Sequence, residues 1–226
     1  MKKRLLGLIM ALSVTLGIHG QDLMVFGGLN NNRFCDYKKE NNQFSTFYSS
    51  LKGTNYGLGL DNVKIAKHSF LFTLRTSAYN GYVYTTVRNP DAVTTTGIEL
   101  SKSTLGLGIY PFNFKILDNH LDFNFGIETN WLLKTTLKGY RTTLSTTDQP
   151  TINTIIDNRS KNMVNQLGMG LSGRLAYRLK IKNDLYLVPQ YTFYCGLTNE
   201  LKHMDANTKS YRHLIEIGLM RKIFSK

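Results

Sequence analysis

Residues 121–133 read LDFNFGIETNWLL, and this stretch decides the fold. From Leu121 onward every second residue is apolar apart from Thr129, and the residues between them are polar or small apart from Leu132. A period of two places side chains alternately on the two faces of a β-strand, whereas a helix repeats its apolar positions every 3.6 residues. Strands of soluble proteins average about five or six residues, and membrane-spanning strands need about 9–11. The length of this stretch therefore favours a strand that crosses a bilayer.

Residues 167–179 repeat the alternation, with glycines and two arginines on the polar face. A transmembrane barrel turns its apolar face to lipid and its polar face to the lumen, and a soluble lipid-binding barrel does the reverse. Periodicity fits both. Aromatic girdles at the two membrane interfaces favour the transmembrane barrel, and aromatic residues do lie near the ends of the candidate strands. They are Tyr56, Tyr79, Tyr82, Tyr84, Tyr110, Trp131, Tyr177, Tyr194, Tyr211 and Phe224.

The chain divides into eight candidate strands. They cover residues 22–32, 53–63, 69–82, 97–112, 120–136, 163–180, 184–198 and 210–224. The connections between them alternate in length: those at 33–52, 83–96, 137–162 and 199–209 are long, and those at 64–68, 113–119 and 181–183 are short. Outer-membrane barrels have short periplasmic turns and longer extracellular loops. The sequence therefore predicts an all-β fold: a closed antiparallel eight-stranded transmembrane β-barrel with short periplasmic turns and four long extracellular loops.

The N-terminus predicts export. Lys2, Lys3 and Arg4 precede an apolar run over residues 5–18, as in a secretory signal peptide. An uncleaved transmembrane helix is the alternative, but the run falls short of the roughly 20 apolar residues that a span needs. We expect cleavage near Gly20 or Gln21, so that residues 1–20 are a signal peptide and 21–226 form the barrel domain in the outer membrane.

The chain is basic, with a formal net charge of +13 over 226 residues. Its Lys and Arg residues are spread along the chain rather than clustered as in nucleic-acid-binding proteins. We therefore expect no nucleic acid partner, and attraction to outer-membrane lipid or lipopolysaccharide instead. The two cysteines, Cys35 and Cys195, could form one disulfide in an exported protein, or could be a loop thiol and a buried thiol.

If one face of each candidate strand points into the lumen, eight charged residues are predicted to lie there. An eight-stranded barrel has an interior that side chains fill, so a paired network is expected to form a plug rather than a selective pore. The set is Asp61, Arg75, Asp122, Glu128, Arg174, Arg178, Arg212 and Glu216.

No catalytic, metal or cofactor site is predicted. His203 and Asp205 could form an acid–base pair in the last long loop, but no nucleophile at a suitable position completes it. We predict a non-enzymatic, monomeric protein with no cofactor and a structural or surface-interaction role. Two alternatives stay open: a component of an envelope secretion or transport machine, and a soluble exported lipid-binding barrel.

Three stretches carry a family resemblance: residues 120–133 (HLDFNFGIETNWLL), 185–199 (LYLVPQYTFYCGLTN) and 211–224. They resemble the outer-membrane β-barrel domain common in Bacteroidetes, which includes PorT-like proteins of type IX secretion and OmpA/OmpX-like small barrels. The resemblance implies a cell-envelope location and possible envelope protein partners. Two features depart from the family pattern: the fourth strand carries Glu99, Lys102 and Ser103, and the chain ends on Ser225-Lys226 instead of an aromatic residue.

Overall fold

The computed structural model describes residues 21–35, 44–65, 68–117, 120–145, 152–158, 164–202 and 208–223. No helix long and apolar enough to cross a membrane occurs among them. The regular elements in these ranges are strands. They are β1 (Asp22–Cys35), β2 (Phe44–Ile65), β3 (His68–Asn89), β4 (Ala92–Ile116), β5 (Leu121–Ser145), β6 (Ile152–Asn158), β7 (Leu167–Tyr177), β8 (Leu179–Lys182), β9 (Leu185–Gly196) and β10 (Lys209–Lys222).

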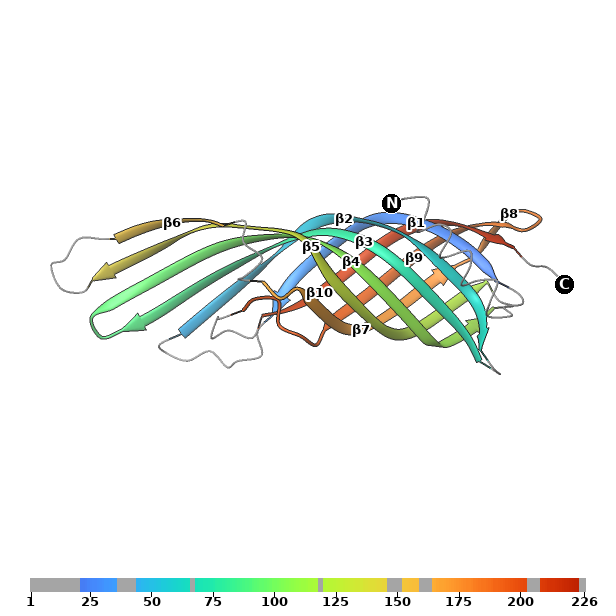
Figure 1. Ribbon diagram of the computed structural model, residues 1–226, viewed down its shortest axis with the longest axis horizontal. Helices are drawn as coiled ribbons and strands as arrows, with labels where there is room; N and C mark the ends of the chain where they lie inside the picture. The colour runs from blue at the N-terminus through green and yellow to red at the C-terminus, as the bar shows by residue number, and fades with distance from the viewer. Residues whose placement is uncertain are drawn as a thin grey trace.

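Eight of the described strands close into an antiparallel ring (Figure 1). The order around the ring is β1, β2, β3, β4, β5, β7, β9 and β10, and β10 pairs with both β9 and β1. The closing pair runs from Asp22↔Lys222 to Cys35↔Lys209 without a register shift. Closure matters because an unpaired strand edge exposes backbone groups that lipid cannot hydrogen-bond. The predicted eight-stranded antiparallel barrel is confirmed.

The sixth predicted strand, at 163–180, is interrupted near its end. β7 pairs with β5 and β9, and after Arg178 the short strand β8 pairs with β9 alone. At the break, the Arg178 amide donates a hydrogen bond of 2.7 Å to the carbonyl oxygen of His120. The interruption places Arg178 at the same end of the barrel as the short connections.

Two predicted long loops are largely strand, which corrects the sequence prediction. Residues 83–96 form the tip of a β3–β4 hairpin, paired up to Asn89↔Ala92 around a turn at Pro90 and Asp91. Within 137–162, β5 continues to Ser145 and β6 pairs back onto it. Asn, Ser and Thr suggested loops, but threonine is β-branched and favours strands. Threonine pairs with threonine at four places across β3, β4 and β5 in these extensions: Thr85↔Thr96, Thr86↔Thr95, Thr95↔Thr142 and Thr94↔Thr143.

The extensions form one raised sheet beyond the barrel, at the end opposite the short connections. It consists of residues 44–50 of β2, 81–89 of β3, 92–101 of β4, 135–145 of β5 and 152–158 of β6. Figure 1 shows these strands projecting well past the ring on one side. Residues 33–35 and 44–52 of the predicted loop 33–52 are strand too, which corrects that prediction as well. Residues 36–43 and 203–207, with the signal segment and the His203/Asp205 pair, lie outside the described residues.

The barrel is inside-out relative to a soluble protein. On β5, the side chains of Phe123 and Ile127 are 43% and 50% exposed, while those of the adjacent Asp122 and Glu128 are each 1% exposed. The same alternation recurs on β7 and β10. A soluble lipid-binding barrel needs an apolar interior and a polar exterior, and this chain has the opposite arrangement. That alternative is therefore wrong.

Several aromatic residues lie inside the barrel, which corrects their assignment to an interfacial girdle. Tyr79, Tyr110 and Tyr194 are each 2% exposed or less. Tyr79 joins an apolar cluster near the raised sheet, whose other members are Phe34, Val83, Ile98, Leu100, Leu132, Leu137, Val164 and Leu201. Tyr56, Trp131 and Tyr177 do face outward. The interior thus combines polar layers with apolar ones.

Candidate functional site

The middle of the lumen holds an ion-pair network built from opposite walls of the barrel. Arg75 on β3 contacts Glu128 on β5 (Nη1 to Oε2, 2.6 Å) and Glu216 on β10 (Nε to Oε1, 3.3 Å). Arg212, four residues before Glu216 on the same face of β10, contacts Glu128 as well (Nη2 to Oε1, 3.1 Å). All four side chains are 1% exposed. The network thus ties strands together across the ring, not only along it.

Glu216 also accepts neutral hydrogen bonds. Gln190 Nε2 and Thr192 Oγ1 each donate to its Oε2 at 2.9 Å, and Asn55 donates to its Oε1. A buried carboxylate is tolerated when several donors satisfy its lone pairs. Gly106 on the neighbouring strand β4 leaves space beside Glu128, since a Cβ there would lie 2.8 Å from Asn130 Oδ1 and 3.3 Å from Glu128 Oε1.

Arg212 lies between two tyrosine rings. Its guanidinium carbon is 3.7 Å from the centroid of Tyr194 and 5.2 Å from that of Tyr79. A planar guanidinium stacks on aromatic faces, and the attraction strengthens when water is excluded. The tyrosines therefore stabilise a cation that is paired, among the described residues, with the single carboxylate of Glu128.

Arg174 is held by neutral partners. Its Nε donates to Gln190 Oε1 and its Nη1 donates to Asn124 Oδ1, both at 2.7 Å. Its Nη2 approaches the sulfur of Met24 at 3.4 Å. Gln190 donates in turn to Glu216, so Arg174 connects to the central network through one amide.

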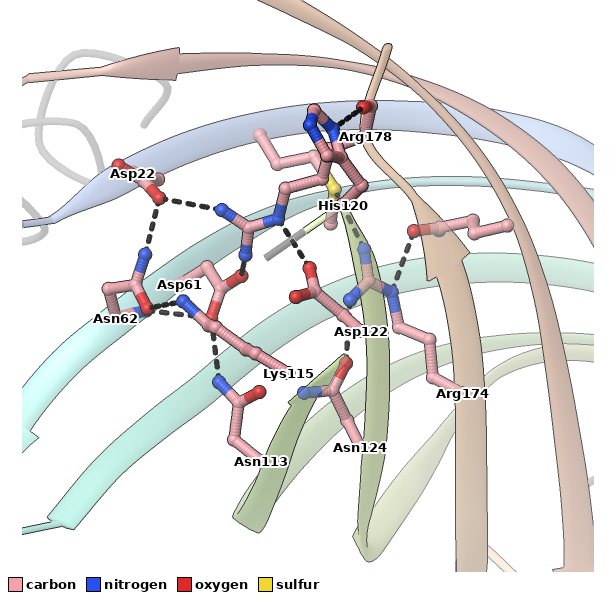
Figure 2. A network of polar contacts seen from close by, with 12 residues as sticks. Asp22, Asp61, Asn62, Asn113, Lys115, His120, Asp122, Asn124, Arg174 and Arg178 are labelled. Carbon is pink, nitrogen blue, oxygen red and sulfur yellow. Dashed lines mark hydrogen bonds and ion pairs between the residues drawn. The ribbon is translucent and has the colours of Figure 1, made fainter. Parts of the chain in front are cut away.

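A second network surrounds Arg178 at the end of the lumen with the short connections (Figure 2). Arg178 Nη2 lies 2.6 Å from Asp61 Oδ2, its Nη1 lies 3.3 Å from Asp22 Oδ2, and its Nε donates to Asp122. These aspartates come from β2, β1 and β5, so one guanidinium joins three strands to the end of β7. The Asp22 contact reaches from the first strand of the ring to the sixth.

A β-bulge shapes the outer part of this network. The register of β2 against β3 shifts between Leu60 and Val63, and Asn62 there has a φ of 58°. Its amide donates to Asp61 Oδ1 at 2.7 Å, and its side chain contacts both Asp22 and Lys115. Asparagine tolerates this left-handed conformation better than most residues, so the bulge brings Asn62 between two charged groups.

A third pair closes the lumen toward the raised sheet. Lys102 on β4 contacts Glu200, which follows β9, and both are buried. Burial alone would raise the pKa of the Glu200 carboxyl, but the Lys102 ammonium beside it holds the pKa below its ordinary value. Val164 and Leu201, which form an isolated β-bridge, pack in the apolar cluster at the same end.

All eight residues of the predicted lumen set are buried and belong to two networks. Arg75, Glu128, Arg174, Arg212 and Glu216 form the central one, and Asp61, Asp122 and Arg178 form the rim one. The predicted set lacks four further charged residues of these networks: Asp22, Lys102, Lys115 and Glu200. Asp22 and Lys102 have the inward parity of their strands, so strand alternation could have found them. Glu200 lies outside a strand and gave no such signal.

The carboxylates of these networks are paired within the barrel. Each carboxylate named is bound by a cation or amide, and no group of three or more His, Cys, Asp or Glu side chains in the described part of the chain could hold a metal ion. Cys195 is a free, partly buried thiol, and the side chain of Cys35 lies outside the described part of the structure.

A closed antiparallel ring with an apolar exterior and a paired, charged interior defines the class of small membrane-spanning β-barrels. No protein-family model matches the chain, and no curated protein matches it. Among solved structures, the chain is similar to outer membrane protein OprG from Pseudomonas aeruginosa. The identity is 15%, the match covers 91% of this chain and 98% of that chain, and the TM-score is 0.38.

Neisserial surface protein A (NspA) is similar with 10% identity over 89% of this chain and 97% of that chain, and a TM-score of 0.40. Ail, the attachment invasion locus protein of Yersinia pestis, solved with the heparin analogue sucrose octasulfate, is similar with 8% identity, 89% and 99% coverage and a TM-score of 0.34. Identities this low extend no role from those proteins to this chain.

Proposed function

We propose that this chain is a non-enzymatic outer-membrane barrel that does not conduct ions and that presents its raised sheet outside the cell for surface interaction. The observation that carries the proposal is the central network of Arg75, Glu128, Arg212 and Glu216, which crosses the lumen from β3 and β5 to β10. Barrels of about 16 strands or more leave an aqueous channel, whereas side chains fill an eight-stranded one.

Planar-bilayer recording tests the plug. The folded chain should give no steady conductance in symmetric salt, because the paired side chains fill the lumen. The double variant Arg75→Ala/Glu128→Ala removes the centre of the network as a neutral pair and should introduce conducting events. Steady channels from the wild-type chain would contradict the proposal. A folded but silent double variant would show that the network is not what closes the lumen.

The surface role draws on the raised sheet. Its outward face carries exposed apolar and aromatic side chains beyond the barrel: Phe47 (64% exposed), Tyr140 (45%) and Ile155 (86%) occupy one cross-strand row. Exposed apolar groups at such a site are typical of an interaction surface. Export of the chain and its localisation are tested by cell fractionation, in which release by osmotic shock would contradict membrane insertion.

The envelope-machine alternative and the Bacteroidetes assignment rest on the sequence resemblance alone. They predict that deletion of the gene blocks secretion of cargo proteins and that mild detergent extracts the chain with envelope partners. Unchanged export after deletion would rule out a required secretion role and leave the surface-interaction proposal intact.

A further inference from the structure

On the outer face of the barrel, at the end with the short connections, a wholly apolar cross-strand row is followed by a row that carries two exposed cations. One cross-strand row on this face is wholly apolar: Leu179, Leu187, Leu219, Val25 and Leu58. The next row toward the barrel end follows the same strands. It consists of Lys182, Leu185, Arg221, Leu23 and Leu60.

Lys182 and Arg221 flank Leu185 from the two neighbouring strands. Neighbouring strands lie about 4.8 Å apart, so the two cations have backbones about 10 Å apart, and rows on one face follow each other at about 7 Å. Both cationic side chains are exposed, and neither forms an ion pair with a described residue. Cations are thus available one row beyond the apolar surface.

The surroundings reinforce the positive charge. Lys180 and Lys222 lie on the same two strands, and the Lys222 ammonium is 5.6 Å from the ring centroid of Tyr186. Among these neighbours one carboxylate is exposed, that of Asp184 in the β8–β9 turn. Lys180 and Lys222 have the inward parity of their strands, so they add positive charge at this end of the barrel while Lys182 and Arg221 are the cations of the outer face.

We infer that this rim binds the phosphate of an anionic phospholipid, whose acyl chains lie against the apolar row while its headgroup lies between Lys182 and Arg221. The inference rests on the proposed membrane placement and adds a lipid class and a site to it. The headgroup phosphate of a phospholipid lies just beyond the hydrocarbon. Lys182 and Arg221 lie in the corresponding position, one row beyond the apolar row.

The size of the effect follows from the number of cations. A Lys or Arg near an anionic membrane surface contributes enough attraction for about a five-fold change in affinity, so removal of two should weaken binding by about 30-fold. A zwitterionic lipid with the same acyl chains should bind the apolar row equally well but gain little from the two cations.

Native mass spectrometry of the folded full-length barrel in mild detergent tests the inference, with phosphatidylglycerol and phosphatidylcholine of identical acyl chains. The wild-type chain should retain phosphatidylglycerol preferentially, and Lys182→Gln/Arg221→Gln should lose that preference. The matched control Lys134→Gln/Lys138→Gln, which removes the same charge at the other end of the barrel, should keep it. An unheated-gel mobility shift confirms that each variant is folded.

Three results would overturn the site: no headgroup preference in the wild-type chain, a preference that survives the Lys182/Arg221 substitutions, or an equal loss in the control variant. Displacement of the lipid by inorganic phosphate at equal concentration would also overturn it, since the apolar row would then contribute nothing. Failure of the wild-type chain to insert into phosphatidylcholine bilayers is a different outcome, because it contradicts the membrane placement itself.

Discussion

The substitution Arg178→Met tests how much the ion pairs around Arg178, as distinct from its packing, contribute to stability. Methionine keeps most of the volume of the arginine stem, so the substitution removes mainly the guanidinium and its bonds to Asp22, Asp61 and Asp122. The arginine side chain is 6% exposed and the three aspartates are 1–4% exposed, so water reaches them poorly. Three carboxylates from three strands would then face one another.

Loss of one partner from a buried ion pair destabilises a protein by about 3–5 kcal/mol. Lys115, which reaches the same network through Asn62, offsets part of this loss. We therefore expect Arg178→Met to lower the free energy of unfolding by about 3 kcal/mol, the lower end of that range. Asp61→Asn added to Arg178→Met should recover part of the loss, because it removes one of the unpaired carboxylates.

Urea unfolding in lipid vesicles, followed by the fluorescence of Trp131, measures this change. Lys180→Met is the matched control, since Lys180 is an exposed cation two residues further along the chain, and it should alter stability by no more than about 0.5 kcal/mol. Equal stability of Arg178→Met and Lys180→Met would refute the reasoning. So would an Asp61→Asn double variant that is less stable than Arg178→Met alone.

Three other substitutions have defined outcomes. Ile127→Arg, on the middle of the outer face, should destabilise the barrel in vesicles by about 2–4 kcal/mol, whereas Ile155→Arg on the raised sheet should fold normally; equal effects would contradict the proposed position of the bilayer. Arg212→Lys keeps the charge but loses the flat stacking between two tyrosine rings, so urea unfolding should show a loss of about 1–2 kcal/mol. Lys102 lowers the pKa of the Glu200 carboxyl, so the pair stabilises the fold at pH values above the unfolded-state pKa of 4.5. This contribution is lost as the pH falls through the lower folded-state pKa. Glu200→Gln should remove this acid dependence from the free energy of unfolding.

Strand alternation predicted the barrel well because lipid and lumen impose opposite demands on neighbouring residues. The eight predicted strands correspond to the eight positions of the ring, and the predicted lumen residues, such as Glu128 and Glu216, are buried on the inner face. Their burial follows from parity alone. Their pairing across the lumen does not, because it depends on which strands face each other once the ring closes.

The extent of the strands was harder to predict. The residues around Thr86 and Thr95 look like a polar loop, but their β-branched side chains pair across a hairpin outside the bilayer, where a strand needs no apolar face. The predicted interfacial position of some aromatic residues was wrong for a related reason. Tyrosine can serve at a membrane interface or inside the lumen, and only the parity of Tyr79 and Tyr194 within their strands distinguishes the two positions.

The most direct test of membrane placement uses the single tryptophan of the chain, Trp131. It lies on the outer face of β5, 44% exposed, between Leu105 and Leu167 of the neighbouring strands. In reconstituted vesicles, lipids brominated on their acyl chains should quench its fluorescence, and aqueous iodide should not. Strong iodide quenching with no effect of brominated lipid would contradict the claim that this apolar face lies in a bilayer.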